Sequence, residues 1–291
     1  MIDSRLRGKV VLVTGGNNPL GIGAATARAF ATQGAAVLVH GYPSTTGGTP
    51  LDPLPSEAGE AQYLALQRRD AAAVVADIRA AGGRAEAIDA DLGDPDVAVS
   101  LFDRAESLLG PVDVLVNNAA HCEQDTLLPA SAIGRNDRAV DAFPLHPLTA
   151  AGFDRHLAVN ARAPALLMTE LARRLLARRA GWGRIVNVST DGARCFPTEV
   201  SYGSSKHALE SLSRAAAHEL GPYGITVNVV SLGPIQTGWI SPELEASLAA
   251  STPLRRIGHP DDVADAIVFL ASHQARWITG QVLHVGGGHT I

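Results

Sequence analysis

The chain has 291 residues, 46% of them hydrophobic, and a formal net charge of −5 at pH 7. That charge provides no basic surface for nucleic acid, and no apolar run approaches the roughly 18–20 residues that span a membrane. Cys122 and Cys195 are isolated and the ten histidines show no metal-ligand spacing, so we expect a cytoplasmic protein with reduced thiols and without a metal site.

Apolar strands alternate with helical stretches along the whole chain. The expected strands cover residues 9–14, 36–40, 84–90, 112–116, 184–189, 225–231 and 281–285. The expected helices cover residues 21–33, 59–81, 95–109, 149–161, 164–179, 201–220 and 261–272. This alternation implies right-handed crossovers and a parallel sheet covered on both faces. We therefore predict one α/β domain over residues 1–291, a doubly wound, mostly parallel, Rossmann-type sheet with helices on both faces.

Two segments depart from the alternation, near residues 41–59 and 121–147. Both are rich in proline and turn-forming residues, and we interpret them as loops inserted after strands. Either they are surface excursions without catalytic consequence, or one of them shapes the substrate or cofactor pocket. The second alternative arises because loops at the carboxyl ends of strands line the crevice in such folds.

Glycines recur in the turn between the first expected strand and the first expected helix, residues 14–23, TGGNNPLGIG. Glycine lets a backbone turn tightly and approach a pyrophosphate closely. The amino terminus of the following helix offers unpaired N–H groups and a partial positive charge to the same anion. Such glycines can also be purely structural, but this position after the first strand favours a dinucleotide site.

A tyrosine and a lysine stand one helical turn apart, at Tyr202 and Lys206. Lys206 is one of only two lysines in a chain with 22 arginines. On a helix both side chains project from one face. A nearby ammonium favours the phenolate and lowers the pKa of a tyrosine, which makes the pair a candidate acid/base catalyst. The spacing also arises by chance on exposed helices, so the pair needs support from the rest of the chain.

These motifs together resemble the short-chain dehydrogenase/reductase family, in its single-domain branch, and most closely its 3-oxoacyl-thioester reductases. The resemblance runs from about Lys9 to Gly287. The family's turn is Thr-Gly-x-x-x-Gly-x-Gly, and this chain carries two additional residues in it. Residues 117–120, NNAA, resemble the family's Asn-Asn-Ala-Gly, and residues 233–237, GPIQT, resemble its stretch beside the nicotinamide, with Leu232 in place of a proline.

The resemblance implies a set of cofactor-binding residues. They are Gly15, Asn17, Asn18, Gly21, Ile22, Gly23, His40, Asp91, Leu92, Asn118, Ala119, Tyr202, Lys206, Pro234, Ile235 and Thr237. Within this set, Asp91 and Leu92 match the contact to the adenine ring. Taken singly, Asp91 could be a helix cap and Asn117 a turn residue.

The resemblance also implies four catalytic residues, namely Asn160, Ser189, Tyr202 and Lys206. Tyr202 would exchange a proton with the substrate oxygen, which Ser189 would hold in line. Lys206 would lower the Tyr202 pKa and bind the nicotinamide ribose, and Asn160 would hold a water for proton exchange. Thr190 competes for the hydroxyl role, but the interval of 13 residues to Tyr202 favours Ser189.

The second expected strand ends in Val39-His40-Gly41-Tyr42 without the acidic residue that usually binds the ribose 2′-hydroxyl of NAD. This mildly favours NADP(H) over NAD(H), with His40 as the nearest partner for a 2′-phosphate. We expect a small carbonyl or alcohol substrate, no nucleic acid or membrane partner, and a homo-oligomer, a tetramer or a dimer. The alternatives are a catalytically inactive dinucleotide sensor and a sugar-nucleotide epimerase or dehydratase. The intact Ser189, Tyr202 and Lys206 argue against the former.

Overall fold

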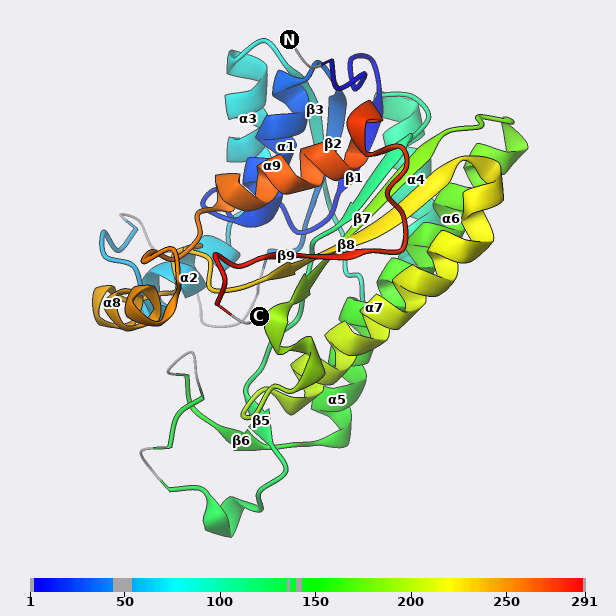
Figure 1. Ribbon diagram of the computed structural model, residues 1–291. Coiled ribbons are helices and arrows are strands. Elements are labelled where there is room, and N and C mark those ends of the chain that lie inside the picture. Colours follow the sequence, from blue (N-terminus) through cyan, green and yellow to red (C-terminus); the bar gives the residue numbers. More distant parts are fainter. Residues whose placement is uncertain (1–2, 44–53, 135–136, 140–142, 290–291) are drawn as a thin grey trace.

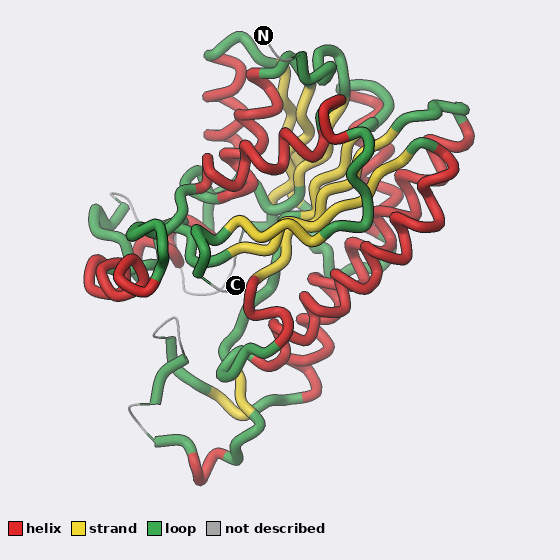
Figure 2. The backbone as a smooth tube through the Cα atoms, in the orientation of Figure 1, coloured by secondary structure: helices red, strands yellow, loops and turns green. Residues whose placement is uncertain are grey.

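The computed structural model describes residues 3–43, 54–134, 137–139 and 143–289. A seven-stranded parallel sheet runs through these residues, with helices against both of its faces (Figure 1, Figure 2). The strand order is β3-β2-β1-β4-β7-β8-β9. The predicted doubly wound α/β fold is therefore confirmed.

The strands are four to eight residues long, and most of them are apolar. Their bounds are β1 Val10–Val13, β2 Ala36–Gly41, β3 Arg84–Asp89, β4 Val114–Asn117, β7 Gly183–Thr190, β8 Ile225–Leu232 and β9 Val282–Val285. All four residues of β1 are buried, as expected of a strand covered on both faces. The strand order reverses on either side of β1, whose Val11 pairs with Val37 of β2 and Val114 of β4. A crevice for ligands opens at the carboxyl ends of strands at such a reversal.

Two apolar layers fix the helices to the sheet. One layer holds α1 (Ile22–Thr32), α3 (Ala72–Ala80) and α9 (Pro260–Ala271) around Phe30. The other holds α4 (Val97–Leu108), α6 (Ala163–Ala177) and α7 (Val200–Leu220) around Phe102. Successive residues of each strand contribute to opposite layers, because side chains alternate along a strand.

The helix expected over residues 59–81 is two helices, α2 (Glu60–Gln67) and α3. The amide of Asn17, which lies in the glycine turn, donates to the carbonyls of Gln67 at 3.3 Å and Arg69 at 3.0 Å. Asp70 accepts from the N–H of Ala72 at 3.0 Å. These bonds satisfy backbone groups that a helix end leaves unpaired and so stabilise the interruption.

The helices expected over residues 149–161 and 164–179 form one continuous rod. It consists of α5 (Ala150–Leu157), a single π-helical turn (Ala158–Arg162) and α6. Thr149 caps α5 by accepting from the N–H of Gly152. The rod continues through Pro164, the second residue of α6, which directly follows the π-helical turn.

Helix α8 (Pro242–Ser251) was not expected. The hydroxyl of Ser241 accepts from the N–H of Leu244, and proline follows Ser241 at the first helical position, a start signal that the sequence did contain. The predicted loop 121–147 carries a two-residue parallel pair, β5 (Asp125–Thr126) with β6 (His146–Pro147). Parts of both predicted inserted loops, residues 44–53, 135–136 and 140–142, lie outside the described residues.

Candidate active site

The glycine turn packs so closely against its neighbours that side chains have no room in it. A Cβ on Gly15, whose φ is +71°, would lie 2.6 Å from the Cα of Ala119. A Cβ on Gly23 would collide with the Gly15 carbonyl and lie 2.6 Å from the amide nitrogen of Asn118. No side chain caps α1 at Gly21, and its first turn holds no acidic residue. The turn and the helix terminus therefore fit a dinucleotide pyrophosphate.

Two residues of the lengthened turn, Asn17 and Asn18, bind other loops of the protein. Asn17 holds the interruption between α2 and α3, as described above. The Asn18 amide donates to the Thr237 carbonyl at 3.0 Å and its oxygen accepts from the N–H of Leu20 at 2.9 Å. The two asparagines thus tie the turn to two segments that are remote in sequence.

A second clamp holds the turn from the end of β4. The Asn118 amide donates to the carbonyls of Thr14 at 2.8 Å and Gly15 at 2.9 Å. The Thr14 hydroxyl in turn accepts from the N–H groups of Asn118 and Ala119, both at 3.0 Å. Asn118 and Ala119 therefore lie against the turn.

The adenine side of the site differs from the prediction at His40. This side chain is only 1% exposed. Its Nδ1 accepts from the N–H of Gly15 at 3.3 Å, and its Nε2 lies 2.9 Å from the Ala90 carbonyl. Burial lowers its pKa to about 4. The prediction of His40 as the partner of a 2′-phosphate is therefore wrong, because the imidazole is uncharged at neutral pH and enclosed between β1 and β3.

Asp91 stands at the end of β3 as expected, but its carboxylate is paired. Arg155 of α5 donates to it through two nitrogens, at 2.9 and 3.2 Å, and the N–H of Gly93 donates at 2.7 Å. The pKa of Asp91 is lowered because these donors and the Arg155 charge outweigh its burial. Leu92 is buried beside it. The Arg155 guanidinium also lies 6.0 Å from the centre of the Tyr42 ring.

The segment after β8 is fixed to its surroundings on two sides. The N–H of Gln236 donates to the Gly258 carbonyl and the N–H of Gly258 to the Pro234 carbonyl, each at 2.9 Å. The Gln236 amide donates to Glu245 of α8 at 2.9 Å. Ile235 is buried. This segment, which the resemblance places beside the nicotinamide, is therefore rigidly held.

Tyr202 and Lys206 lie one turn apart in α7. The Lys206 ammonium is 5.7 Å from the centre of the Tyr202 ring and donates to the Val188 carbonyl of β7 at 2.8 Å. Lys206 is only 2% exposed, and this burial lowers its pKa to about 8. The spacing in the sequence thus corresponds to a buried ammonium next to a partly buried phenol.

The expected lowering of the Tyr202 pKa does not occur in this environment. Burial raises that pKa well above its usual value of about 10, and Cys122 and Glu199, when ionised, raise it further. Burial of a group that ionises to an anion disfavours the anion. The phenol is therefore held in its protonated form.

Ser189 and Thr190 point in different directions from the end of β7. The Ser189 hydroxyl is 2% exposed and donates to the buried carboxylate of Glu210, in α7, at 2.9 Å. It lies on the same face of the strand as Asn187, whose amide donates to Ser213 of α7 at 2.7 Å. Thr190 is partly exposed, and its hydroxyl accepts a longer bond, 3.3 Å, from the N–H of Gly192. The structure therefore contradicts the choice of Ser189 over Thr190, because the Ser189 hydroxyl is directed into the core.

Asn160 stands in the middle of the π-helical turn and is fully buried. Its amide donates to the His121 carbonyl at 2.8 Å and to the Ser205 hydroxyl at 2.9 Å, while its oxygen accepts from the N–H of His121. Ser205 donates to the Tyr202 carbonyl at 2.7 Å. Asn160 is thus connected to the catalytic helix through Ser205. π-Helical turns often mark functional positions.

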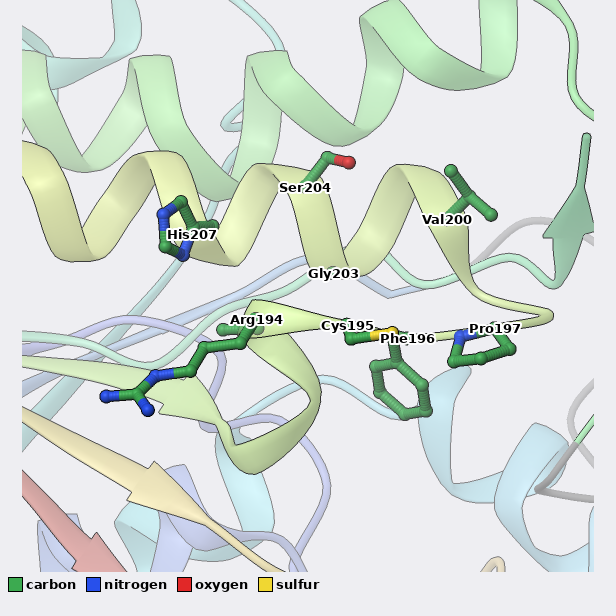
Figure 3. Close-up of a pocket in the computed structure, with 9 residues that line it drawn as sticks. Arg194, Cys195, Phe196, Pro197, Val200, Gly203, Ser204 and His207 are labelled. Carbon is green, nitrogen blue, oxygen red and sulfur yellow. The ribbon is translucent and has the colours of Figure 1, made fainter.

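A pocket of about 470 Å³ opens beside α7 (Figure 3). Ser204 and His207 of α7 form one wall, and the segment from Arg194 to Pro197 forms the other. Phe196 lines this pocket, and its ring centre lies 6.0 Å from that of Tyr202.

Three residues near the site were not identified from the sequence. His289 lies 2.8 Å from Asp191, the residue after Thr190. Arg155 holds Asp91, and Tyr63 of α2 lies close enough to Tyr202 to influence its pKa. No local pattern marks these residues, because each is far in sequence from its partner.

Among the described residues, no group of His, Cys, Asp and Glu side chains could hold a metal ion, and no helix is long and apolar enough to cross a membrane.

Comparison with known proteins gives consistent matches over nearly the whole chain. The family model described as enoyl-(acyl carrier protein) reductase matches residues 56–290. An uncharacterized oxidoreductase of Bacillus subtilis is 33% identical over 281 residues, which cover 96% of each chain. The solved structure of a short-chain dehydrogenase/reductase from Serratia marcescens is 31% identical with a TM-score of 0.76, covering 98% of this chain and 99% of that one. An angucycline C-6 ketoreductase with bound NADP is 31% identical with a TM-score of 0.74, covering 98% and 97%.

Proposed function

Since the chain belongs to the short-chain dehydrogenase/reductase family, it is an NAD(P)-dependent oxidoreductase that acts on CH–OH groups, and we propose that Tyr202 is its general acid/base. The observation that carries this proposal is the pairing of Tyr202 with the buried Lys206 ammonium on one turn of α7. The reaction is the interconversion of a ketone and a secondary alcohol.

A bound nicotinamide supplies the hydride in reduction and accepts it in oxidation. Tyr202 donates a proton to the carbonyl oxygen during reduction and removes it from the hydroxyl during oxidation. Because the Tyr202 pKa is raised, the phenol is the resting form and is ready to act as the acid. With its pKa at about 8, Lys206 is mainly charged at pH 7, and this charge stabilises the phenolate that proton donation leaves behind.

The second hydroxyl of the site is that of Thr190. A group that holds the substrate oxygen must be able to reach it. Its hydrogen bonds within the protein must also be weak enough to be replaced by one to the substrate. The Thr190 hydroxyl meets these requirements because it is partly exposed at the carboxyl end of β7. The Ser189 hydroxyl instead stabilises the buried carboxylate of Glu210. Asn160 positions the catalytic helix through Ser205, and a water on its turn would return protons from solvent.

The cofactor is NADP(H) in preference to NAD(H). Gly41, the last residue of β2, and Tyr42, which follows it, occupy the position of the usual acidic residue. The similar angucycline ketoreductase was solved with NADP. Residues that would hold the dinucleotide are Gly15, Gly21, Ile22 and Gly23 at the pyrophosphate. Asn118, Ala119, Pro234, Ile235 and Thr237 would lie towards the nicotinamide, and Asp91 and Leu92 at the adenine. Comparing KM for NADPH and NADH tests the preference, and a lower KM for NADH would contradict it.

The substrate is an apolar carbonyl compound, in view of two aromatic residues, Phe196 in the segment after β7 and Trp239 in the segment after β8. The protein acts in the cytoplasm as a homo-oligomer. Leu212 and Ala215 support the assembly because they are exposed on α7, beside polar residues such as Arg214. Light scattering of the purified protein gives the oligomeric state directly.

The decisive test of the activity is the variant Tyr202→Phe. A panel of ketones is reduced with NADPH, and turnover is followed by nicotinamide absorbance. We expect the wild type to reduce at least one ketone and the variant to show no turnover, while its affinity for NADPH, measured by fluorescence titration, stays within about twofold. Turnover close to wild type in the variant would refute the assignment of Tyr202.

A further inference from the structure

The loop inserted after β4 carries one acidic residue, Asp125, whose backbone is held firmly in place. Asp125 lies in β5 and pairs with His146 of β6. On one side of it, the Gln124 carbonyl accepts from the N–H of His146 at 3.3 Å. On the other side, the Thr126 carbonyl accepts from the N–H of Leu148 at 2.9 Å. Asp125 is therefore fixed by backbone bonds to the segment that leads into α5.

The side chain of Asp125 binds the helix that carries Tyr202 and Lys206. Its carboxylate accepts from the N–H of Ser201 at 2.9 Å and also from the Ser201 hydroxyl. Asp125 is 7% exposed and Ser201 is 0% exposed, so water hardly competes for these bonds. Hydrogen bonds to a carboxylate are roughly twice as strong as those between neutral groups. The inserted loop and α7 are thus joined at one buried point.

This point is the amino end of α7. Ser201 is the second residue of the helix, and the first N–H groups of a helix have no partner within it. Glu199, at the N-cap position, makes no side-chain cap bond, and the first turn of α7 holds no acidic residue. Asp125 supplies both an acceptor for an end N–H and a negative charge at the positive end of the helix. The cap of α7 therefore comes from a residue 76 positions earlier in the chain.

Tyr202 directly follows Ser201 in this first turn, so its position depends on how the turn is held. Lys206, one turn further, has an anchor of its own at the Val188 carbonyl. A general acid must lie within hydrogen-bond reach of the oxygen that it protonates. A displacement of about 1 Å can cost about 10²-fold in rate. Loosening the first turn would therefore displace the phenol while the ammonium stays in place.

We propose that Asp125 is a positioning residue, which fixes the first turn of α7 through Ser201 and so holds the Tyr202 phenol at the reacting oxygen of the substrate. This inference rests on the proposed role of Tyr202 for its catalytic consequence. The bonds between Asp125 and Ser201 are independent of that role.

The variant Asp125→Ala tests the proposal by removing both bonds to Ser201. We measure kcat and KM for a ketone that the wild type reduces, with saturating NADPH and well below the melting temperature of each variant. A displaced acid slows the chemical step, so kcat should fall at least about tenfold, while KM for the ketone stays within about twofold. Asp125→Asn should restore most of the rate, because its amide oxygen can still accept from the N–H of Ser201. A kcat within twofold of wild type in Asp125→Ala would overturn the proposal.

Asp262→Ala is the matched control for a loss of stability. Asp262 is a carboxylate at the amino end of α9, on the other face of the sheet, and accepts from the N–H of His259 at 2.8 Å. Its removal should lower the melting temperature and leave kcat within about twofold, and an equal loss of kcat in both variants would reduce Asp125 to a structural cap. If Asp125→Ala does not fold, Ser201→Ala takes its place, because it removes only the hydroxyl bond. Its kcat should fall at least about threefold, and an unchanged kcat would then refute the positioning role.

A second measurement separates this proposal from the proposed function. The protein is labelled with 3-fluorotyrosine, and the fluorine resonance of Tyr202 is identified by its absence from Tyr202→Phe. This resonance reports the surroundings of the phenol without any turnover. It should move in Asp125→Ala, return towards its wild-type position in Asp125→Asn and stay unchanged in Asp262→Ala. If the wild type reduces no ketone, the proposed function fails and the spectrum alone decides, with identical resonances in the wild type and Asp125→Ala counting against Asp125.

Discussion

Replacing the two neighbouring hydroxyl residues of β7 separates a structural role from a catalytic one. In Ser189→Ala, the Glu210 carboxylate, which is 5% exposed, loses a donor at 2.9 Å. A hydrogen bond to a charged group contributes about 1.5–3 kcal/mol, so the variant should unfold about 3–6 °C lower, given roughly 2 °C per kcal/mol for a chain of this size. Its kcat should fall by less than about fivefold because the hydroxyl does not face the substrate.

Thr190→Ala should show the opposite pattern. Loss of a donor to the reacting oxygen lowers kcat by about 10²–10³, whereas a partly exposed hydroxyl contributes little to stability, so the melting temperature should change by less than about 2 °C. Thr190→Ser keeps the hydroxyl and should retain most activity. The assays are ketone reduction with saturating NADPH and thermal unfolding followed by circular dichroism. A hundredfold loss in Ser189→Ala with an active Thr190→Ala would refute the reasoning.

Three further predictions concern Lys206 and the glycine turn. Lys206→Arg should lose most activity although it keeps the charge, because the larger guanidinium does not fit the buried site. A normal rate of ketone reduction in this variant would show that the lysine is incidental. The pKa of Lys206 is about 8 in the folded protein, which is below its value in the unfolded chain. The free-energy cost of burying the charged amine is therefore present in full below pH 8, and it disappears as the pH rises towards 10.5. Urea unfolding should therefore show the wild type gaining up to about 3 kcal/mol relative to Lys206→Met between pH 7 and 10, and parallel pH profiles would contradict this. Gly23→Ala should weaken NADPH binding at least tenfold because its Cβ collides with the Gly15 carbonyl. The control in the same titration is Gly221→Ala, where nothing lies within 4 Å of the added Cβ. Equal NADPH affinities of the two variants would argue against the turn as the binding site.

The sequence was sufficient to predict features that depend on local order. Alternating strands and helices led to the correct fold class, and the spacing of Tyr202 and Lys206 indicated one helical turn. The interruption of the helix after Gln67 could not be predicted, because the side chain that stabilises it, Asn17, belongs to a turn 50 residues away. Burial reversed the expected shift of the Tyr202 pKa, since a pattern of residues does not reveal how much water surrounds a phenol.

The choice between Ser189 and Thr190 shows how a count along the chain can mislead. An interval of 13 residues favoured Ser189, but a strand presents alternate residues to opposite faces. Asn187 and Ser189 share the face that packs on α7, which leaves Thr190 at the open end of the strand. The alternation of side chains along β7 was more informative than this interval. It shows which residues face α7 once one residue of the strand is known to contact that helix.

The scarcity of lysine has a practical consequence for attaching the enzyme to a support. Lys206 is enclosed, whereas the side chain of Lys9 is 32% exposed. Lys9 immediately precedes β1, at the edge of the sheet opposite to the catalytic groups. Among the side-chain amines, Lys9 is therefore the one that amine-reactive reagents will modify, and a linkage there leaves the catalytic groups at the other end of the strands accessible to substrate.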